Sequence, residues 1–165
     1  MKIIKQLLPS LLLLKLKITM IKSSIFFLLL LCSTVNAQTK MDDILGNWMA
    51  TDKSVKVQVY KEGGTFKAKV IWYDIKLGSG KPMHASVDHR NPNPNMRHRK
   101  IIGMEVLDGL HFNSATKRWE NGKIYDASSG RTWDSYAEIR ADGELIVRGY
   151  WKWQWIGKTL HFERY

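Results

Sequence analysis

A polar segment at residues 88–99 carries the densest set of side chains that could do chemistry. It reads Asp-His-Arg-Asn-Pro-Asn-Pro-Asn-Met-Arg-His-Arg. Arg97, Arg99 and Lys100 are suited to clamping a carboxylate or phosphate, because guanidinium groups match such anions bidentately. A purely structural role is the alternative, since Asn before Pro favours turns and Arg97 can simply pair with Asp88. A binding loop and a structural loop are both compatible with this pattern.

Metal binding and catalysis receive little support from the remaining polar residues. His84, His89 and His98 lie in or beside the polar segment, but their spacing matches no zinc motif and no thiolate accompanies them. We therefore expect no metal and no other cofactor. The chain also lacks a nucleophile elbow and a phosphate-cradling glycine loop, so no catalytic residue is assigned. Carboxylates such as Asp134 and Glu138, which alternation places on one strand face, keep a hydrolase acting on envelope carbohydrate as an alternative.

Aromatic residues are abundant after residue 37, with seven Trp, six Tyr and three Phe. Trp151, Trp153 and Trp155 are predicted to share one face of a strand that begins at Leu145. That face can form an aromatic cleft, but large aromatics dominate protein cores and the core is the favoured interpretation. Together with the polar segment, these features predict a site for a small, partly apolar or anionic ligand, lined by Asp88, Asn91, Arg97, Arg99, Trp119, Tyr125 and Arg148.

The elements that position these residues are predicted to be strands. Val55, Val57 and Val59 alternate with polar residues, as do Phe66, Ala68, Val70 and Trp72, and a glycine turn separates the two runs. A loop is predicted over residues 78–100. Further strands are expected over residues 101–107, 123–125, 132–140, 145–155 and 159–165, with turns at Asp108-Gly109, Glu120-Asn121-Gly122, Asp126 to Gly130, Asp142-Gly143 and Gly157.

About eight consecutive strands joined by short turns predict an all-β domain over residues 38–165. Such strands close into an antiparallel up-and-down barrel or stack as a sandwich. A barrel leaves no free edges, and eight strands leave an interior able to hold one small ligand. We therefore expect a single barrel domain with the ligand inside it.

Residues 1–37 are predicted to be a secretory signal peptide. They contain five lysines and no acidic residue, followed by an apolar run at residues 25–31 and small residues up to Ala37. Met20 begins a second complete signal, so it is the alternative start. A lipid anchor on Cys32 is another alternative. Lysines interrupt every window long enough for a spanning helix, so none is expected, and the protein is predicted to be periplasmic or secreted.

Removal of this segment changes the charge of the protein. The chain has 165 residues, one cysteine and a formal net charge of +11. Loss of 37 residues with five lysines leaves 128 residues, no cysteine and a charge of +6. The remaining lysines are spread rather than clustered, and export separates the protein from chromosomal DNA. We therefore expect no nucleic-acid partner.

Two resemblances follow from these residues. Gly46-Asn47-Trp48 resembles the start of lipocalin-type barrels, which implies that Trp48 closes one end of the barrel and packs against a basic residue, here Arg164. A longer series resembles the bacterial exported family catalogued as domain of unknown function 2147. It includes residues 44–48, 88–97, Arg99, 102–104, Trp119, 121–126, 130–133, 142–143, 147–150 and 157–159. The resemblance implies a small lipocalin-like barrel. Besides ligand binding and hydrolysis, an interaction module of the envelope without a small ligand remains a hypothesis.

Overall fold

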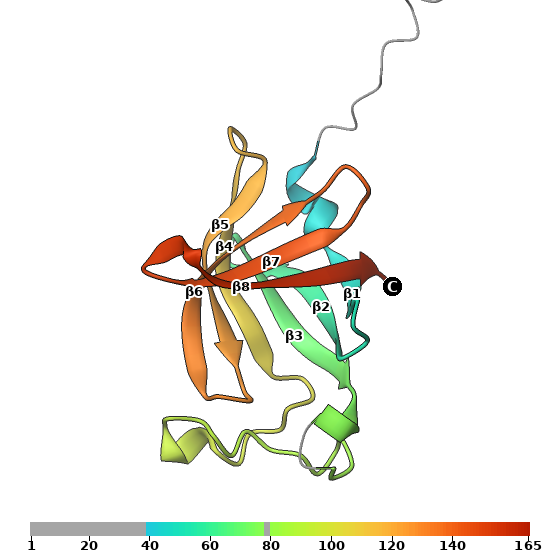
Figure 1. Ribbon diagram of the computed structural model, residues 1–165, viewed down its shortest axis with the longest axis vertical. Helices are drawn as coiled ribbons and strands as arrows, with labels where there is room; N and C mark the ends of the chain where they lie inside the picture. Colours follow the sequence, from blue (N-terminus) through green and yellow to red (C-terminus); the bar gives the residue numbers. More distant parts are fainter. Residues whose placement is uncertain (1–38, 78–79) are drawn as a thin grey trace, which may run out of the picture. The chain divides into compact units, whose positions relative to one another are not determined.

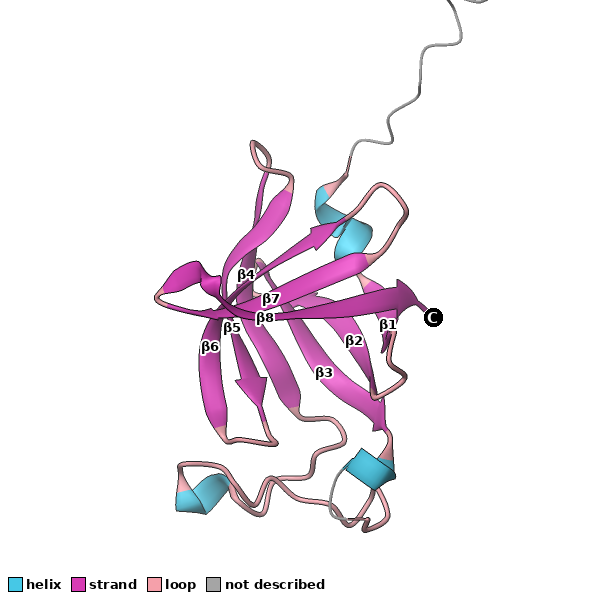
Figure 2. Ribbon diagram, in the orientation of Figure 1, coloured by secondary structure: helices cyan, strands magenta, loops and turns pink. Residues whose placement is uncertain are grey.

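The protein folds into a closed antiparallel β-barrel in which every strand pairs with its neighbours in the sequence (Figures 1 and 2). A computed structural model describes residues 39–77 and 80–165; the predicted signal peptide lies outside the described residues. The strands are β1 (Gly46–Ala50), β2 (Val55–Glu62), β3 (Thr65–Tyr73), β4 (Glu105–Asn113), β5 (Arg118–Asp126), β6 (Arg131–Ile139), β7 (Leu145–Trp151) and β8 (Trp153–Arg164). The prediction of an all-β up-and-down barrel is confirmed.

Three short 3-10 helices, η1 (Met41–Ile44), η2 (Ile75–Leu77) and η3 (Pro94–Met96), accompany the strands. The helix η1 precedes β1 and buries Ile44 in the barrel core. The other two lie in the long connection between β3 and β4, which leaves the barrel at the same end as the β5–β6 turn. Most of this connection is the predicted loop, and a single bridge between Val87 and Lys100 holds its two arms together.

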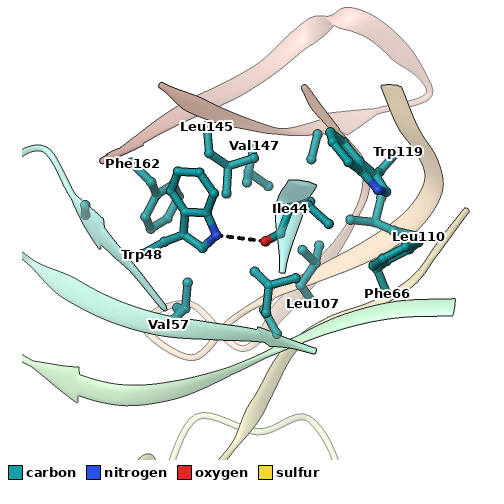
Figure 3. Close-up of a cluster of buried hydrophobic side chains, with 14 residues drawn as sticks. Ile44, Trp48, Val57, Phe66, Leu107, Leu110, Trp119, Leu145, Val147 and Phe162 are labelled. Carbon is teal, nitrogen blue, oxygen red and sulfur yellow. Dashed lines mark hydrogen bonds between the residues drawn. The ribbon is translucent and has the colours of Figure 1, made fainter. Parts of the chain in front are cut away.

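The barrel interior is packed with apolar side chains (Figure 3). Alternate residues along the strands point inward, as the period of a pleated strand requires. The largest fully buried side chains include Trp48, Trp119, Phe66, Leu110 and Leu145. A hollow of only about 30 Å³ remains among the core residues, between Val57, Leu107, Ile124, Val147 and Phe162.

Trp48 occupies the position that the lipocalin-type motif implied. Its indole Nε1 donates a hydrogen bond to the Ile44 carbonyl oxygen at 2.8 Å, which ties η1 to the first strand (Figure 3). The Arg164 guanidinium lies 4.4 Å from the centre of the Trp48 ring, and it also donates to the Leu45 carbonyl oxygen at 2.9 Å. This cation–π pair joins the first and last strands beside η1.

Two predicted turns are instead continuous strand. Asp108-Gly109 lies inside β4 and Asn121-Gly122 lies inside β5, and the two irregular positions face each other. Gly109 and Asn121 adopt left-handed backbone conformations (φ of 73° and 63°), which gives the residue pairs their turn-like composition. Regular pairing resumes on both sides, at Asp108 with Lys123 and at His111 with Glu120. The register of β4 with β5 is the same on both sides, so the two left-handed residues interrupt the ladder without ending either strand; the register shifts lie in the pairings of β4 with β3 and of β5 with β6.

The tryptophan-rich segment is also not one strand. The chain reverses at Lys152 (φ of 57°), so Trp151 ends β7, Trp153 begins β8, and Gly157 lies within β8. Trp151, Trp153 and Trp155 are 54%, 56% and 72% exposed. The prediction that they form the barrel core is wrong, because the core residues of this hairpin, Leu145, Val147 and Phe162, lie toward its other end, away from the turn that carries the tryptophans.

Candidate functional site

Asp88 is the centre of a buried polar cluster at the base of the long loop. The residue is 1% exposed, and its backbone N–H donates to the Arg99 carbonyl oxygen at 2.9 Å. One carboxylate oxygen accepts from the Tyr125 hydroxyl at 2.7 Å. The other accepts from Asn91 Nδ2 at 2.7 Å and from Arg99 Nη2 at 2.9 Å. The buried charge is thus fully hydrogen-bonded, as a buried carboxylate requires.

Tyr125 and Arg99 complete this cluster at the wall of the barrel. The Arg99 guanidinium lies 5.5 Å from the centre of the Tyr125 ring. Burial raises the pKa of Tyr125 to about 12, and the hydrogen bond to the Asp88 carboxylate acts in the same direction. Tyr125 therefore stays protonated at neutral pH and acts as a hydrogen-bond donor that links β5 to the loop.

The rest of the polar segment holds the loop against the β5–β6 turn. Arg97 Nε donates to the Asn91 carbonyl oxygen at 2.9 Å, and the Asn91 side chain accepts from the Asn93 backbone N–H at 2.9 Å. Arg90 donates to the Ser128 carbonyl oxygen. Gly130 is needed in this contact, because a Cβ atom there would lie 2.1 Å from the Arg90 carbonyl oxygen. The loop is therefore docked on the barrel through main-chain as well as side-chain contacts.

A recess of about 300 Å³ opens beside this cluster. The long loop contributes Asn91, Pro92 and Arg99. Strand β4 contributes Glu105, Val106, Leu107 and Asp108, and β5 and β6 contribute Lys123, Tyr125 and Thr132. Val106 and Leu107 line both this recess and the small interior hollow. The recess thus lies between the loop and the barrel wall, not in the centre of the barrel.

The charges around the recess are arranged in pairs. Glu105 and Asp108 each lie 3.4 Å from Lys67 Nζ, and the Tyr60 hydroxyl donates to Glu105 at 2.8 Å. These contacts hold both carboxylates on the β3–β4 side. Lys123 pairs with Asp134, away from them.

Arg99 keeps hydrogen-bonding capacity beyond its pair with Asp88. Its Nε is buried, and among residues 39–77 and 80–165 it has no hydrogen-bond partner. The side chain as a whole is 32% exposed and borders the recess. Buried polar groups are normally paired, so the unpaired Nε is an exception, and the exposed third of the side chain is the part that can meet a ligand in the recess.

The seven predicted site residues fall into two groups. Asp88, Asn91, Arg99 and Tyr125 form one hydrogen-bonded cluster, and Arg97 supports it through the Asn91 backbone. Trp119 and Arg148 lie elsewhere.

Trp119 is fully buried at the end of the barrel near η1, where its Nε1 donates to the Met41 carbonyl oxygen at 2.9 Å. It also packs edge-to-face on Phe66. Arg148 lies on β7, where its guanidinium donates to Thr159 Oγ1 at 2.7 Å and to the Gln154 carbonyl oxygen at 2.5 Å. Neither residue lines the recess.

Sequence reasoning missed the β4 wall of the recess and Lys123. Alternation along β5 places Lys123 on the same outer face as Tyr125, and this pattern could have identified it. Glu105 and Val106 were assigned to a strand without a role, because the contact between β4 and the loop is tertiary.

The carboxylates that kept a hydrolase as an alternative are held in ion pairs. Asp134 pairs with Lys123, and Glu138 pairs with Arg118 at 2.5 Å. In the described part of the chain, no group of three or more His, Cys, Asp or Glu side chains is placed to hold a metal ion. Within the same residues, no helix has the length and apolarity to cross a membrane.

Comparisons with known proteins agree with this fold. The sequence model of a bacterial family, described as "Uncharacterized protein conserved in bacteria (DUF2147)", matches residues 46–164. A solved structure, described as protein HP1028 from the human pathogen Helicobacter pylori that belongs to the lipocalin family, is 25% identical with a TM-score of 0.62. The match covers 74% of this chain and 82% of HP1028. Among curated proteins, no sequence matches this chain.

Proposed function

The chain belongs to the DUF2147 family and folds as a lipocalin-like barrel, and from this premise we propose that it binds a small, partly apolar ligand with an anionic group. The binding site is the recess between the long loop and strands β4 and β5. The protein acts in the bacterial envelope or outside the cell, a location supported by the signal-peptide pattern of residues 1–37.

The observation that carries the proposal is the recess wall around Arg99. A volume of about 300 Å³ is at the small end of ligand sites in proteins. Arg99 offers a cationic guanidinium there, because its side chain borders the recess and is about one-third exposed. Val106, Leu107 and Pro92 supply apolar surface on the same recess. The recess therefore offers a complementary surface to the anionic group and to the apolar part of the proposed ligand.

The site differs from the one that the strand count suggested. An eight-stranded barrel can hold a small ligand in its interior, but here that interior retains a hollow of only about 30 Å³. A space of this size takes roughly one water molecule. The recess under the loop is ten times larger and carries the polar groups that orient a ligand, so the ligand is placed there.

Pre-organisation by Asp88 explains how a surface loop can form a binding site. The carboxylate fixes Arg99, Asn91 and Tyr125 through three hydrogen bonds from different parts of the chain. Side chains that are already ordered lose less conformational entropy when a ligand binds. The loop is thus both a structural element and a binding element.

Native mass spectrometry of the protein purified from its own bacterium tests this proposal. Thr132 lies exposed on the recess wall, so Thr132→Trp should fill the recess without removing a core contact. Thr51→Trp is the matched control, because Thr51 is also an exposed threonine but lies in the β1–β2 turn outside the recess.

We expect the wild type and Thr51→Trp to retain a small molecule that Thr132→Trp lacks. Arg99→Lys, which keeps the charge but loses the guanidinium fork, should retain less of it than the wild type. Bare protein in all cases, or a ligand retained equally by Thr132→Trp, would overturn the proposal.

A second candidate function, an interaction module of the envelope, is favoured by one specific observation. The protein combines a filled barrel interior with exposed tryptophans at the β7–β8 turn. Exposed apolar patches on monomeric proteins commonly mark interaction surfaces. The two functions use different surfaces and are compatible with each other.

A further inference from the structure

The β7–β8 turn presents an aromatic surface that the barrel does not cover. Trp151, Trp153, Trp155 and Ile156 are each at least half exposed. The Trp153 and Trp155 rings stack on each other with centroids 5.1 Å apart and planes 12° apart, and Trp151 packs edge-to-face on Trp133 at 5.8 Å. We call residues 151–156 the aromatic turn. It stands out from the side of the barrel in Figure 1.

Both faces of this turn are open to solvent. All residues from Trp151 to Lys158 are exposed, although successive side chains of a strand point to opposite faces. A protein or a sugar that docks on a sheet covers one face only. Lipid headgroups and the adjoining acyl boundary surround an inserted turn on both faces, and therefore match this exposure better.

The ring arrangement also favours lipid over carbohydrate. A sugar stacks on the free face of an aromatic ring, and the mutual stack of Trp153 and Trp155 leaves only one such face on each ring. Both residues nevertheless remain more than half exposed. Tryptophan side chains of this amphipathic kind concentrate at membrane–water interfaces, where the ring body contacts apolar groups and the N–H contacts polar ones.

The positive charge of the aromatic turn favours anionic lipids. No acidic residue occurs between Glu144 and Glu163, while Arg148, Lys152 and Lys158 lie in this interval. Arg148 is turned toward Gln154 and Thr159, and Lys158 is within electrostatic reach of Asp52 and Asp126.

Lys152 lies exposed at the reversal itself, between Trp151 and Trp153. Asp134, which is in register with Tyr150, is neutralised by Lys123. The turn therefore carries positive charge without an opposing carboxylate of its own.

We propose that the aromatic turn docks the barrel peripherally on an anionic phospholipid surface. The tryptophans enter the interfacial layer and Lys152 contacts the acidic headgroups. Docking of this kind does not depend on the recess and would place the barrel, with any ligand it carries, beside a membrane.

Co-sedimentation with phospholipid vesicles tests the proposal. The protein is used as the host exports and processes it, with its N-terminus verified by intact mass, so that all variants share the same N-terminus. Vesicles of phosphatidylcholine with phosphatidylglycerol are compared with vesicles of phosphatidylcholine alone. We expect binding to the anionic vesicles that weakens as salt is added.

Variants of the turn should weaken this binding by predictable amounts. The double variant W153A/W155A should lower the partition coefficient at least about tenfold, because two indole rings no longer enter the interface. Lys152→Gln should lower it about fivefold. Leu77→Ala is the matched control, because Leu77 is 70% exposed but lies in η2 outside the turn, and it should bind like the wild type. Circular dichroism checks that each barrel is folded.

Three outcomes would overturn the proposal. One is an absence of binding to anionic vesicles, and another is binding that W153A/W155A leaves unchanged. The third is a tryptophan-dependent interaction of another kind without vesicle binding, either retention on insoluble peptidoglycan or self-association seen by sedimentation velocity. These results would assign the aromatic turn to a glycan or to a second copy of the chain.

Discussion

Asp88 should stabilise the long loop more than any other polar side chain in it. The carboxylate is buried and accepts hydrogen bonds from Tyr125, Asn91 and Arg99. Asp88→Ala removes the two acceptor oxygens and with them all three hydrogen bonds. Breaking a buried charge pair commonly costs 3–5 kcal/mol, but Arg99 is about one-third exposed and can regain water. We therefore expect a loss of about 3 kcal/mol in the free energy of unfolding of the loop.

Asp88→Asn provides the matched comparison. Its carbonyl oxygen can still accept from Asn91 and Arg99, while its amide can donate to the Tyr125 hydroxyl oxygen. Only the charge opposite Arg99 is lost, which should cost about 1–2 kcal/mol. The order of stability should therefore be wild type, then Asp88→Asn, then Asp88→Ala.

Hydrogen exchange separates loss of the loop from loss of the barrel. The β-strand ladders do not depend on Asp88, so the loop should open locally while the barrel stays closed. The amide of Asp88, which donates to Arg99, should lose protection in Asp88→Ala, while core amides in β2 and β7 keep theirs. Urea unfolding followed by circular dichroism measures the global stability. Equal protection in the wild type and Asp88→Ala, or equal effects of the two variants, would refute the reasoning.

Three further predictions concern the supports of the loop and the barrel end. Gly130→Ala should destabilise the protein by more than Gly143→Ala in thermal unfolding, because both residues have positive φ but only Gly130 has a backbone oxygen in the way of the new Cβ; equal costs would contradict the close approach. Burial raises the pKa of Tyr125 to about 12, above its ordinary value of 10.0, so its contribution to stability is complete below pH 10 and is lost as the pH rises toward 12. Tyr125→Phe should flatten this alkaline loss in pH-dependent unfolding, and an unchanged slope would refute it. Trp48→Phe should cost about 1–3 kcal/mol in urea unfolding, since it removes the bond to Ile44 and weakens the contact with Arg164; wild-type stability would contradict the role of Trp48 in closing the barrel end.

The fold was predictable where sequence and tertiary pairing agree. Alternation at Val55 to Val59 and at Phe66 to Val70 gives the β2–β3 hairpin, and Asp142-Gly143 gives the β6–β7 turn. Trp48 and Arg164 were also paired correctly. In each case the local pattern and the closed barrel favour the same structure.

The errors have a common physical cause. Asp108-Gly109 and Asn121-Gly122 have the composition of tight turns, but they face each other across β4 and β5 and only interrupt two continuous strands that keep their register. The reverse occurs at Lys152, where the chain turns without glycine or asparagine. Local composition indicates where a residue adopts a left-handed backbone conformation. Strand pairing then decides whether the strand ends at that residue.

Only the local part of the candidate site was predictable from the sequence, because its other contacts are made between distant parts of the chain. The polar segment identified Asp88 and Asn91 as loop-forming residues and Arg99 as an anion-binding one. The partner of Asp88 was expected to be Arg97, but the bridge between Val87 and Lys100 places Arg99 beside it. Tyr125, which is 37 residues from Asp88, joins through the register of the barrel. Such contacts depend on the closed fold and not on local spacing.

The most direct test of ligand binding in the recess is a crystal structure of the protein purified from its own bacterium. We predict electron density for a small molecule under the long loop, with an anionic group at the Arg99 guanidinium and apolar atoms against Val106 and Leu107. An empty recess, or a ligand enclosed by the core residues of the barrel, would contradict the proposed site.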